Sequence, residues 1–311
     1  MKRNEKAPTI ITAYFDIGRG DYSNEYTRGN NKYIEYFKFW AGMKNNLIIY
    51  TQKQFEEEIY EIRKNNGLAD KTKIIVIDDI YELLPDIYDR MRQIENDKTY
   101  FINYRYLKNT PENKAKYCYI MLLKTWCMMD AVSKKYVKDD FIAWLDFGFN
   151  HGGMIYTDSN DFNFLWKYSF KEKIYLSGIS EDLNKPIFEI IQNGEVYVQG
   201  TPYVVPVSLM KTFYDLIINA INSLLDVGFM DDDQTLLLMA YRSRKDIFIY
   251  DVNDWFLLLK KYGGTHLKIK EQNSNKKDNL KNKLLYRYRV NKRNRIYLNG
   301  LKKIFLKDYL D

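Results

Sequence analysis

Short apolar runs alternate with amphipathic stretches along the first half of the chain. Three runs are rich in β-branched and aromatic residues with little polar alternation, which is typical of strands covered on both faces. They span residues 9–15, 47–50 and 73–77. Helical patterns lie between them at residues 33–41 and 52–65. The resulting βαβαβ order predicts a largely parallel sheet with right-handed crossovers.

The pattern changes in the second half. A helix-rich stretch, residues 81–135, leads to a fourth apolar strand at residues 141–145. Further strands are predicted at residues 173–177, 195–199, 203–207 and 246–250, and helices at residues 209–225 and 235–241. The whole pattern predicts an α/β fold, with a mostly parallel central sheet flanked by helices.

Length and composition favour one large domain followed by a tail. The 311 residues are 46% hydrophobic, which suits a domain over residues 1–267 and a separate segment, residues 268–311. No apolar stretch approaches the roughly 20 residues that cross a bilayer, and no apolar signal core follows the charged N-terminus. Cys118 and Cys127 lie in one apolar helical pattern, as expected of buried thiols in a reducing compartment. These features predict a cytoplasmic protein.

The positive charge is concentrated in the tail. Residues 268–311 hold fourteen Lys and Arg against four Asp and Glu, an excess of ten, so the net charge of +7 leaves residues 1–267 at −3. Aromatic and aliphatic residues are interspersed among these cations. Such a segment can bind an anionic membrane, follow a nucleic-acid backbone, or pack as a helix with its cations in solvent. The acidic body lacks a nucleic-acid-binding module, so we expect no nucleic-acid partner.

A lone carboxylate follows the fourth strand. Asp146 comes directly after residues 141–145, and Gly148 would let a ligand approach the backbone there. Ligands of α/β proteins gather at such strand ends. Asp146 could bind a divalent cation or a sugar hydroxyl, or it could be a structural carboxylate satisfied by solvent and backbone donors.

An acidic cluster opens the last apolar helix. Asp231, Asp232 and Asp233 are followed there by Gln234. One acid could cap the helix and interact with its dipole, but three in a row exceed what a cap needs. We therefore expect chemical roles within this cluster.

Three separated motifs carry a family resemblance. Residues 12–19, 144–148 and 231–234 occur in an order that resembles the YibB/HtrL-like family of bacterial proteins, which are found with surface-polysaccharide genes and regarded as glycosyltransferases. The resemblance covers residues 9–265 and implies an A-type glycosyltransferase fold. In that fold residues 1–150 would bind the nucleotide sugar and residues 151–267 would form the acceptor side.

The resemblance also suggests donor and acceptor contacts. Fixed cations near the diphosphate would stabilise the leaving group. The predicted donor-binding residues are Asp16, Gly18, Arg19, Arg28, Asp78, Lys124, Asp146 and Gly148. Asp16 and Asp78 end strands and would accept hydrogen bonds from the base or ribose, or else cap turns. His151 and Gly200 are placed on the acceptor side, although His151 could equally cap a turn or be a plain loop histidine.

A divalent cation is a second implication. The usual A-type signature has a second acid where this chain has Gly148, whereas residues 233–237 are similar to the Asp-Gln motif of retaining transferases that use a late histidine. The resemblance implies that Asp146 and His266 hold Mn²⁺ or Mg²⁺ together with the diphosphate. The alternative is a site without a cation.

The sequence leaves open whether the transfer inverts or retains the configuration at the anomeric carbon of the sugar. One of the three acids, Asp231, Asp232 or Asp233, could be the general base of an inverting enzyme. In a retaining enzyme Asp233 would hold the sugar and Gln234 would lie beside the anomeric carbon. The predicted catalytic residues are thus Asp232, Asp233 and Gln234.

These features together predict a nucleotide-sugar-dependent glycosyltransferase. Its acceptor would be a growing bacterial surface glycan, such as capsule or lipopolysaccharide, built on a lipid carrier. The basic tail would bring the enzyme to the anionic inner face of the cytoplasmic membrane. The alternative function is a sugar-nucleotide or glycan-binding protein of the same fold without catalysis, because the second acid is missing.

Overall fold

The computed structural model describes residues 4–21, 29–97, 114–181 and 183–270. Within these ranges one sheet has the strand order β3-β2-β1-β4-β6-β5-β7. The strands are β1 (Thr9–Tyr14), β2 (Leu47–Thr51), β3 (Thr72–Val76), β4 (Phe141–Trp144), β5 (Ile174–Gly178), β6 (Tyr203–Pro206) and β7 (Phe248–Val252). The α-helices are α1 (Asn30–Trp40), α2 (Lys53–Asn65), α3 (Pro85–Asn96), α4 (Ala115–Ser133), α5 (Ile187–Asn193), α6 (Met210–Asp226), α7 (Asp233–Ser243) and α8 (Leu257–Lys261).

The sheet is mostly parallel, as the apolar runs predicted. β1 pairs in parallel with both β2 and β4, β2 with β3, and β5 with β7. β6 is the exception, because it runs antiparallel to its neighbours β4 and β5. The α/β fold class predicted from the sequence is therefore confirmed.

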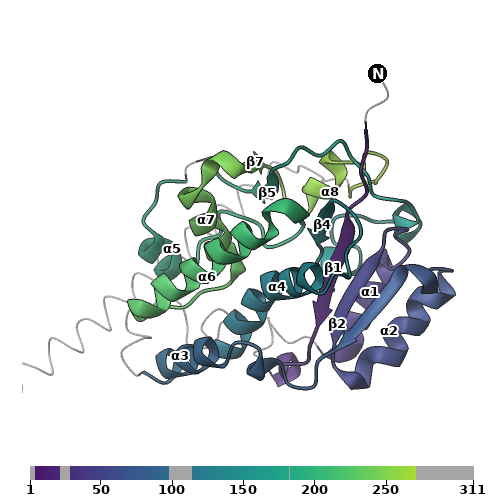
Figure 1. Ribbon diagram of the computed structural model, residues 1–311. Helices are drawn as coiled ribbons and strands as arrows, with labels where there is room; N and C mark the ends of the chain where they lie inside the picture. Colours follow the sequence, from purple (N-terminus) through teal and green to yellow (C-terminus); the bar gives the residue numbers. More distant parts are fainter. Residues whose placement is uncertain (1–3, 22–28, 98–113, 182, 271–311) are drawn as a thin grey trace, which may run out of the picture. The chain divides into compact units, whose positions relative to one another are not determined.

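Helices cover both faces of the sheet. One core joins Ile11, Ile48 and Trp144 to α3, α4, α5, α6 and α7, and the other joins Ile10 and Ile49 to α1, α2 and α8 (Figure 1). Because successive strand residues point to opposite faces, central strands buried on both sides need apolar residues at nearly every position. This requirement explains the uninterrupted apolar runs.

One predicted strand does not form. Residues 195–199 make an isolated bridge between Val198 and Gly178 instead of a full ladder. Two backbone hydrogen bonds attach them to the end of β5, and the Gln199 side chain bonds the backbone at Asn253. The alternation of apolar and polar residues was therefore a misleading strand signal here.

Two predictions concern the membrane. In the described part of the chain, no helix is long and apolar enough to cross a membrane. The predicted basic tail, residues 268–311, lies outside the described residues apart from its first three positions.

The antiparallel strand β6 determines which segments meet at the end of β4. Trp144, the last residue of β4, is in register with Tyr203, the first residue of β6. The amino end of β6 therefore lies beside the carboxyl end of β4. As a consequence, Gly200 and Thr201 reach the same edge of the sheet as Asp146.

Candidate active site

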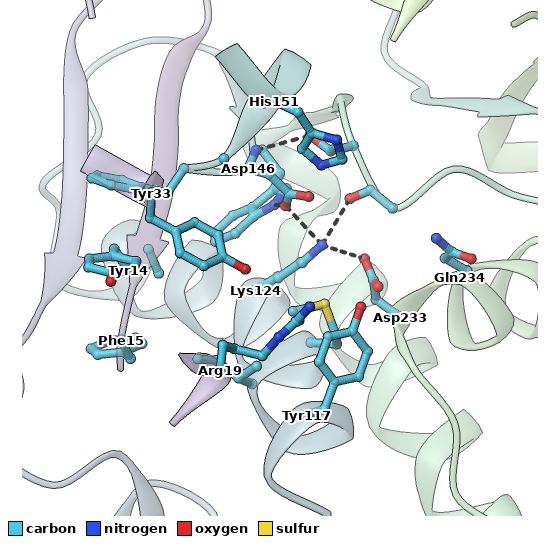
Figure 2. Close-up of a pocket in the computed structure, with 18 of the residues that line it drawn as sticks. Tyr14, Phe15, Arg19, Tyr33, Tyr117, Lys124, Asp146, His151, Asp233 and Gln234 are labelled. Atoms are coloured by element: carbon cyan, nitrogen blue, oxygen red, sulfur yellow. Dashed lines mark hydrogen bonds and ion pairs between the residues drawn. The ribbon is translucent and has the colours of Figure 1, made fainter. Parts of the chain in front are cut away.

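A cavity of about 400 Å³ opens at this edge of the sheet (Figure 2). It is bordered by the end of β1, by α1 and α4, by the segment after β4, by Gly200 and Thr201, and by the start of α7. Its ionisable and amide side chains are Arg19, Lys124, Asp146, His151, Asp233 and Gln234. Aromatic side chains form much of the remaining wall, namely Tyr14, Phe15, Tyr33, Tyr117, Trp144, Phe147, Trp255 and Phe256.

Lys124 joins two carboxylates at the centre of the site. Its Nζ lies 2.8 Å from Asp146 Oδ1 and 2.9 Å from Asp233 Oδ2, and it also donates to the Gly200 carbonyl oxygen at 3.3 Å (Figure 2). The lysine side chain is only 6% exposed. A buried ammonium needs such partners, because removing it from water without them costs several kcal/mol. We call Lys124, Asp146 and Asp233 the charged cluster.

Asp146 is held from two directions. Its backbone N–H donates to Thr201 Oγ1 at 3.0 Å, and Trp144 Nε1 donates to its Oδ1 at 2.6 Å. Its side chain is 33% exposed and borders the cavity. The carboxylate is thus fixed in orientation while part of it faces the space where a ligand would bind.

Asp233 approaches the backbone at Gly200. It is the first residue of α7, and its side chain is 8% exposed. A Cβ at position 200 would collide with Asp233 Oδ2, so any other residue there would displace the carboxylate. Gly200 therefore permits the close approach of the segment before β6 to the Asp233 carboxylate.

The two acids that precede Asp233 in the sequence, Asp231 and Asp232, have structural partners. Asp232 is the N-cap of α7 and accepts a hydrogen bond from the Gln234 backbone N–H at 3.0 Å. Asp231 accepts from Thr235 Oγ1 at 2.6 Å. Neither acid lines the cavity. The structure thus gives Asp232 the capping role, and the catalytic role predicted for it is not supported, whereas Asp233 and Gln234 do face the cavity.

Burial and charge set the protonation of the cluster. For Lys124, burial lowers the pKa, but Asp146 and Asp233 outweigh that effect and raise it above its ordinary value. For Asp233, burial is the largest effect and raises the pKa to about 6, while Lys124 counteracts the rise and Asp146 adds to it. When all three groups are charged, two carboxylates and one ammonium give the cluster one net negative charge.

The predicted donor residues divide into two groups. Arg19, Lys124, Asp146 and Gly148 line the cavity, whereas Asp16, Gly18 and Asp78 do not. The Asp16 carboxylate instead accepts hydrogen bonds from the Gly18 backbone N–H at 2.8 Å and from Asn30 Nδ2 at 2.9 Å, which fixes the loop after β1. Asp78 is exposed at a bend, and Arg28 lies outside the described residues.

The predicted acceptor-side residues lie at the cavity, whereas the predicted metal ligand His266 lies outside it. His151 and Gly200 line the cavity. His266 does not: its side chain is exposed, its Nε2 lies 3.0 Å from the Asp161 carbonyl oxygen, and its ring packs against Phe164. The structure therefore does not bring His266 to Asp146, contrary to the sequence prediction.

The residues present do not fit a cation held by the protein. Asp146 Oδ1 already accepts from Trp144 and pairs with Lys124, Gly148 replaces the second acid, and His266 lies elsewhere. Among the described residues, no three His, Cys, Asp or Glu side chains form a metal-binding group. We therefore derive no step of the chemistry through a metal ion.

Sequence reasoning missed the partners of the cluster. Lys124 was expected beside a diphosphate, but it pairs with carboxylates. The signal was present, because Lys124 is a single charge within the apolar stretch of α4, and a buried lysine needs an anionic partner. Trp144 lies in the motif at residues 144–148, but that motif did not indicate its hydrogen bond to Asp146, and no signal pointed to Thr201.

Comparisons with known proteins extend these observations. The profile of a family described as "Bacterial protein of unknown function (HtrL_YibB)" matches residues 6–263. Protein HtrL of Escherichia coli (strain K12) is 28% identical over 284 residues, which cover 86% of this chain and 96% of that protein.

Two solved structures are distantly similar. Mouse xyloside xylosyltransferase 1, in its apo form, has a TM-score of 0.40 at 12% identity and covers 86% of this chain and 98% of its own. The PaToxG glycosyltransferase has a TM-score of 0.32 at 9% identity and covers 77% and 70%. The family match includes all three motifs noted in the sequence and nearly the whole described chain, and this protein therefore belongs to the HtrL_YibB family of bacterial proteins.

Proposed function

We propose that this protein is a glycosyltransferase that moves a sugar from a nucleotide-sugar donor to a hydroxyl group of an acceptor glycan. The observation that carries the proposal is the charged cluster at the cavity. The three N–H groups of Lys124 are used to hold Asp146, Asp233 and the Gly200 carbonyl oxygen, and the carboxylate oxygens that border the cavity can accept hydrogen bonds from adjacent hydroxyl groups of a sugar ring. The net negative charge of the cluster also favours hydroxyl groups over phosphate.

Arg19 is the residue that we assign to the donor diphosphate. It lines the cavity from the start of the short 3-10 helix Arg19–Asp21 that follows β1, and its guanidinium lies 5.2 Å from the centre of the Tyr117 ring. Lys124 is committed to two carboxylates and is therefore a poor phosphate ligand. Arg19 suits this role because a guanidinium binds phosphate through paired hydrogen bonds.

The cluster also suits the transfer step. The bond between the anomeric carbon and the diphosphate breaks, and its electron pair leaves with the nucleoside diphosphate. The acceptor oxygen forms the new bond, and its proton passes to the departing diphosphate, or to the Asp233 carboxylate where that group acts as general base. Asp146 and Asp233 would stabilise the positive charge that develops on the sugar, while Arg19 stabilises the charge on the leaving group. Gln234, next to Asp233 and facing the cavity, would orient the sugar.

The identity of the acceptor rests on the family resemblance. The surface-polysaccharide context noted for YibB/HtrL-like proteins supports a bacterial capsule or lipopolysaccharide acceptor. Attachment to an anionic membrane through residues 268–311 stays a prediction from composition, because nearly all of that segment lies outside the described residues.

Donor hydrolysis tests the proposed function without knowledge of the acceptor. We expect the purified protein to release nucleoside diphosphate slowly from one class of UDP-, GDP- or CDP-sugar, because water can replace the acceptor hydroxyl in a transferase site. The release is measured by chromatography, with the matching sugar 1-phosphate as a control substrate. Calorimetric binding of a donor without release would favour the non-catalytic binding protein. The proposal would be contradicted if the protein neither bound nor hydrolysed any sugar nucleotide of the panel.

The hydrolysis rate should depend on the ionisation of Asp233. Its pKa of about 6 predicts that the rate is full above that pH and falls as the pH decreases through it, because the protonated carboxyl loses its charge. Initial rates between about pH 5 and about pH 8, at constant ionic strength, measure the profile. Asp233→Asn should be slow and should lack this pH dependence. Asp246→Asn, at an exposed position in the short 3-10 helix Lys245–Ile247, should keep the wild-type profile. A wild-type rate that is constant down to about pH 5 would exclude this role.

A further inference from the structure

Two large apolar side chains remain exposed where the cavity meets solvent. Trp255 is 37% exposed and Met154 is 58% exposed, and both line the cavity. The other tryptophans of the described chain that form its core, such as Trp144 and Trp166, are almost completely buried. An exposed indole beside a cavity is a feature of ligand-binding surfaces.

The loop that carries Trp255 is held by one buried amide. Gln199 is fully buried, and its Nε2 donates to the carbonyl oxygens of Asn253 at 2.9 Å and Asp254 at 3.2 Å. Its Oε1 accepts from the Phe256 backbone N–H at 3.1 Å. Three hydrogen bonds thus fix the backbone on both sides of Trp255. The exposed indole is therefore attached to a backbone segment whose conformation is fixed.

A second buried amide holds the facing loop. Asn150 is fully buried; its Oδ1 accepts from the backbone N–H groups of Ile155 and Tyr156, and its Nδ2 donates to the Tyr156 carbonyl oxygen. The next residue, His151, lines the cavity, and its ring centre lies 5.8 Å from that of Phe256. The two loops therefore meet beside the cavity.

Backbone strain is concentrated at this meeting point. Among the residues that the structure describes, four non-glycine residues have a left-handed backbone, and three of them are Asn150 (φ 59°), His151 (φ 44°) and Phe256 (φ 68°). Each such residue costs on the order of 1 kcal/mol or more and persists where the surroundings enforce it. Strain enforced by two buried amides around one cavity points to a functional surface.

The position of this surface favours the acceptor. Figure 2 shows His151 and Arg19 on opposite sides of Lys124, so the loops at His151 and Phe256 lie away from the proposed diphosphate contact. We propose that Trp255, with Met154 and His151, forms a binding subsite for a sugar ring of the acceptor glycan. The indole would stack on the apolar C–H face of the ring, and the imidazole would bond a hydroxyl group. This inference rests on the proposed function and identifies where its acceptor binds.

Saturation-transfer NMR with simple methyl glycosides tests the subsite without requiring turnover. The probes are methyl α- and β-glycosides of glucose, galactose and mannose, at millimolar concentration. We expect at least one of them to receive saturation at its ring protons from the wild-type protein. Trp255→Ala should weaken the apparent affinity for that glycoside by at least about tenfold, whereas Trp255→Phe, which keeps an aromatic face, should stay within about threefold. Phe188→Ala removes an exposed aromatic side chain that does not line the cavity and should have no effect.

Donor hydrolysis in the same variants separates this inference from the proposed function. In Trp255→Ala we expect donor hydrolysis to fall by less than about threefold, well below the loss of glycoside affinity, because water needs no aromatic surface to bind it. The melting temperature should match that of the wild type. Equal loss of hydrolysis and glycoside binding would place Trp255 at the donor and overturn the subsite. Unchanged glycoside affinity in Trp255→Ala, or no glycoside bound by the wild type, would also overturn it. Glycoside binding without hydrolysis in the wild type would reject the transferase while retaining the subsite.

Discussion

Replacement of Lys124 by methionine should both destabilise the protein and abolish donor hydrolysis. Methionine has a similar length but no charge, so Asp146 and Asp233 would face each other around a buried apolar side chain. Removal of one partner from a buried ion pair costs about 3–5 kcal/mol, and we expect the free energy of unfolding to fall by about this amount. Denaturant unfolding followed by circular dichroism measures the loss.

Two variants identify the cause of this loss. Lys124→Met combined with Asp233→Asn removes one of the two repelling charges and should recover part of the stability but no activity. Lys211→Met removes a lysine whose partner Asp215 lies one turn away on the exposed surface of α6, so it should change the unfolding midpoint little. Wild-type stability in Lys124→Met would contradict the ion-paired cluster as the structure describes it.

Asp146→Asn should reduce donor hydrolysis by at least about a hundredfold and leave the melting temperature within a few degrees. The amide keeps the size of the carboxylate but removes the charge that would bind the sugar and stabilise its transition state. Stability should change little because Lys124 retains Asp233 as a partner, and because Asp146 is partly exposed. Nucleoside diphosphate release and thermal unfolding measure the two effects.

Asp140 provides a matched control on the same strand. It precedes β4, whereas Asp146 follows it, and it is paired with Lys6. Asp140→Asn removes the same charge at the opposite end of the strand and should hydrolyse donor at the wild-type rate. Near-normal hydrolysis by Asp146→Asn would remove the main support for the proposed function.

The sequence pattern predicted the sheet well where burial imposes a simple rule. β1 and β2 are buried on both faces, so their apolar runs were unambiguous. β3 lies at the edge of the sheet and is only partly buried, yet its run of Ile74, Ile75 and Val76 was still sufficient to predict a strand. The seven-residue helix α5 was missed, because so short an element carries little periodicity. Residues 195–199 alternate like a strand, but tertiary contacts through Gln199 determine their conformation.

The candidate site was predictable only in part, because some of its contacts depend on tertiary packing rather than on a local sequence pattern. Asp146 and Asp233 could be located because strand ends and helix starts are general ligand positions. Their connection through Lys124 depends on the packing of α4, which no local pattern encodes. His266 was expected from its place in the sequence, but its contact with Asp161 puts its side chain outside the cavity. A position along the chain does not determine where a loop directs its side chain.

The antiparallel placement of β6 has a consequence for how the protein folds. Lys124 bonds Gly200 and Asp233, which follow it by 76 and 109 positions, and Asp146 bonds Thr201, 55 positions later. Contacts between such distant segments form late, because the entropy of closing the intervening chain must be overcome first. A nascent chain that has been synthesised only as far as α6 lacks Asp233, one carboxylate of the charged cluster, even if its helices have already formed. Sugar-nucleotide affinity should therefore arise only in the last stage of refolding, after most of the helical signal has been recovered.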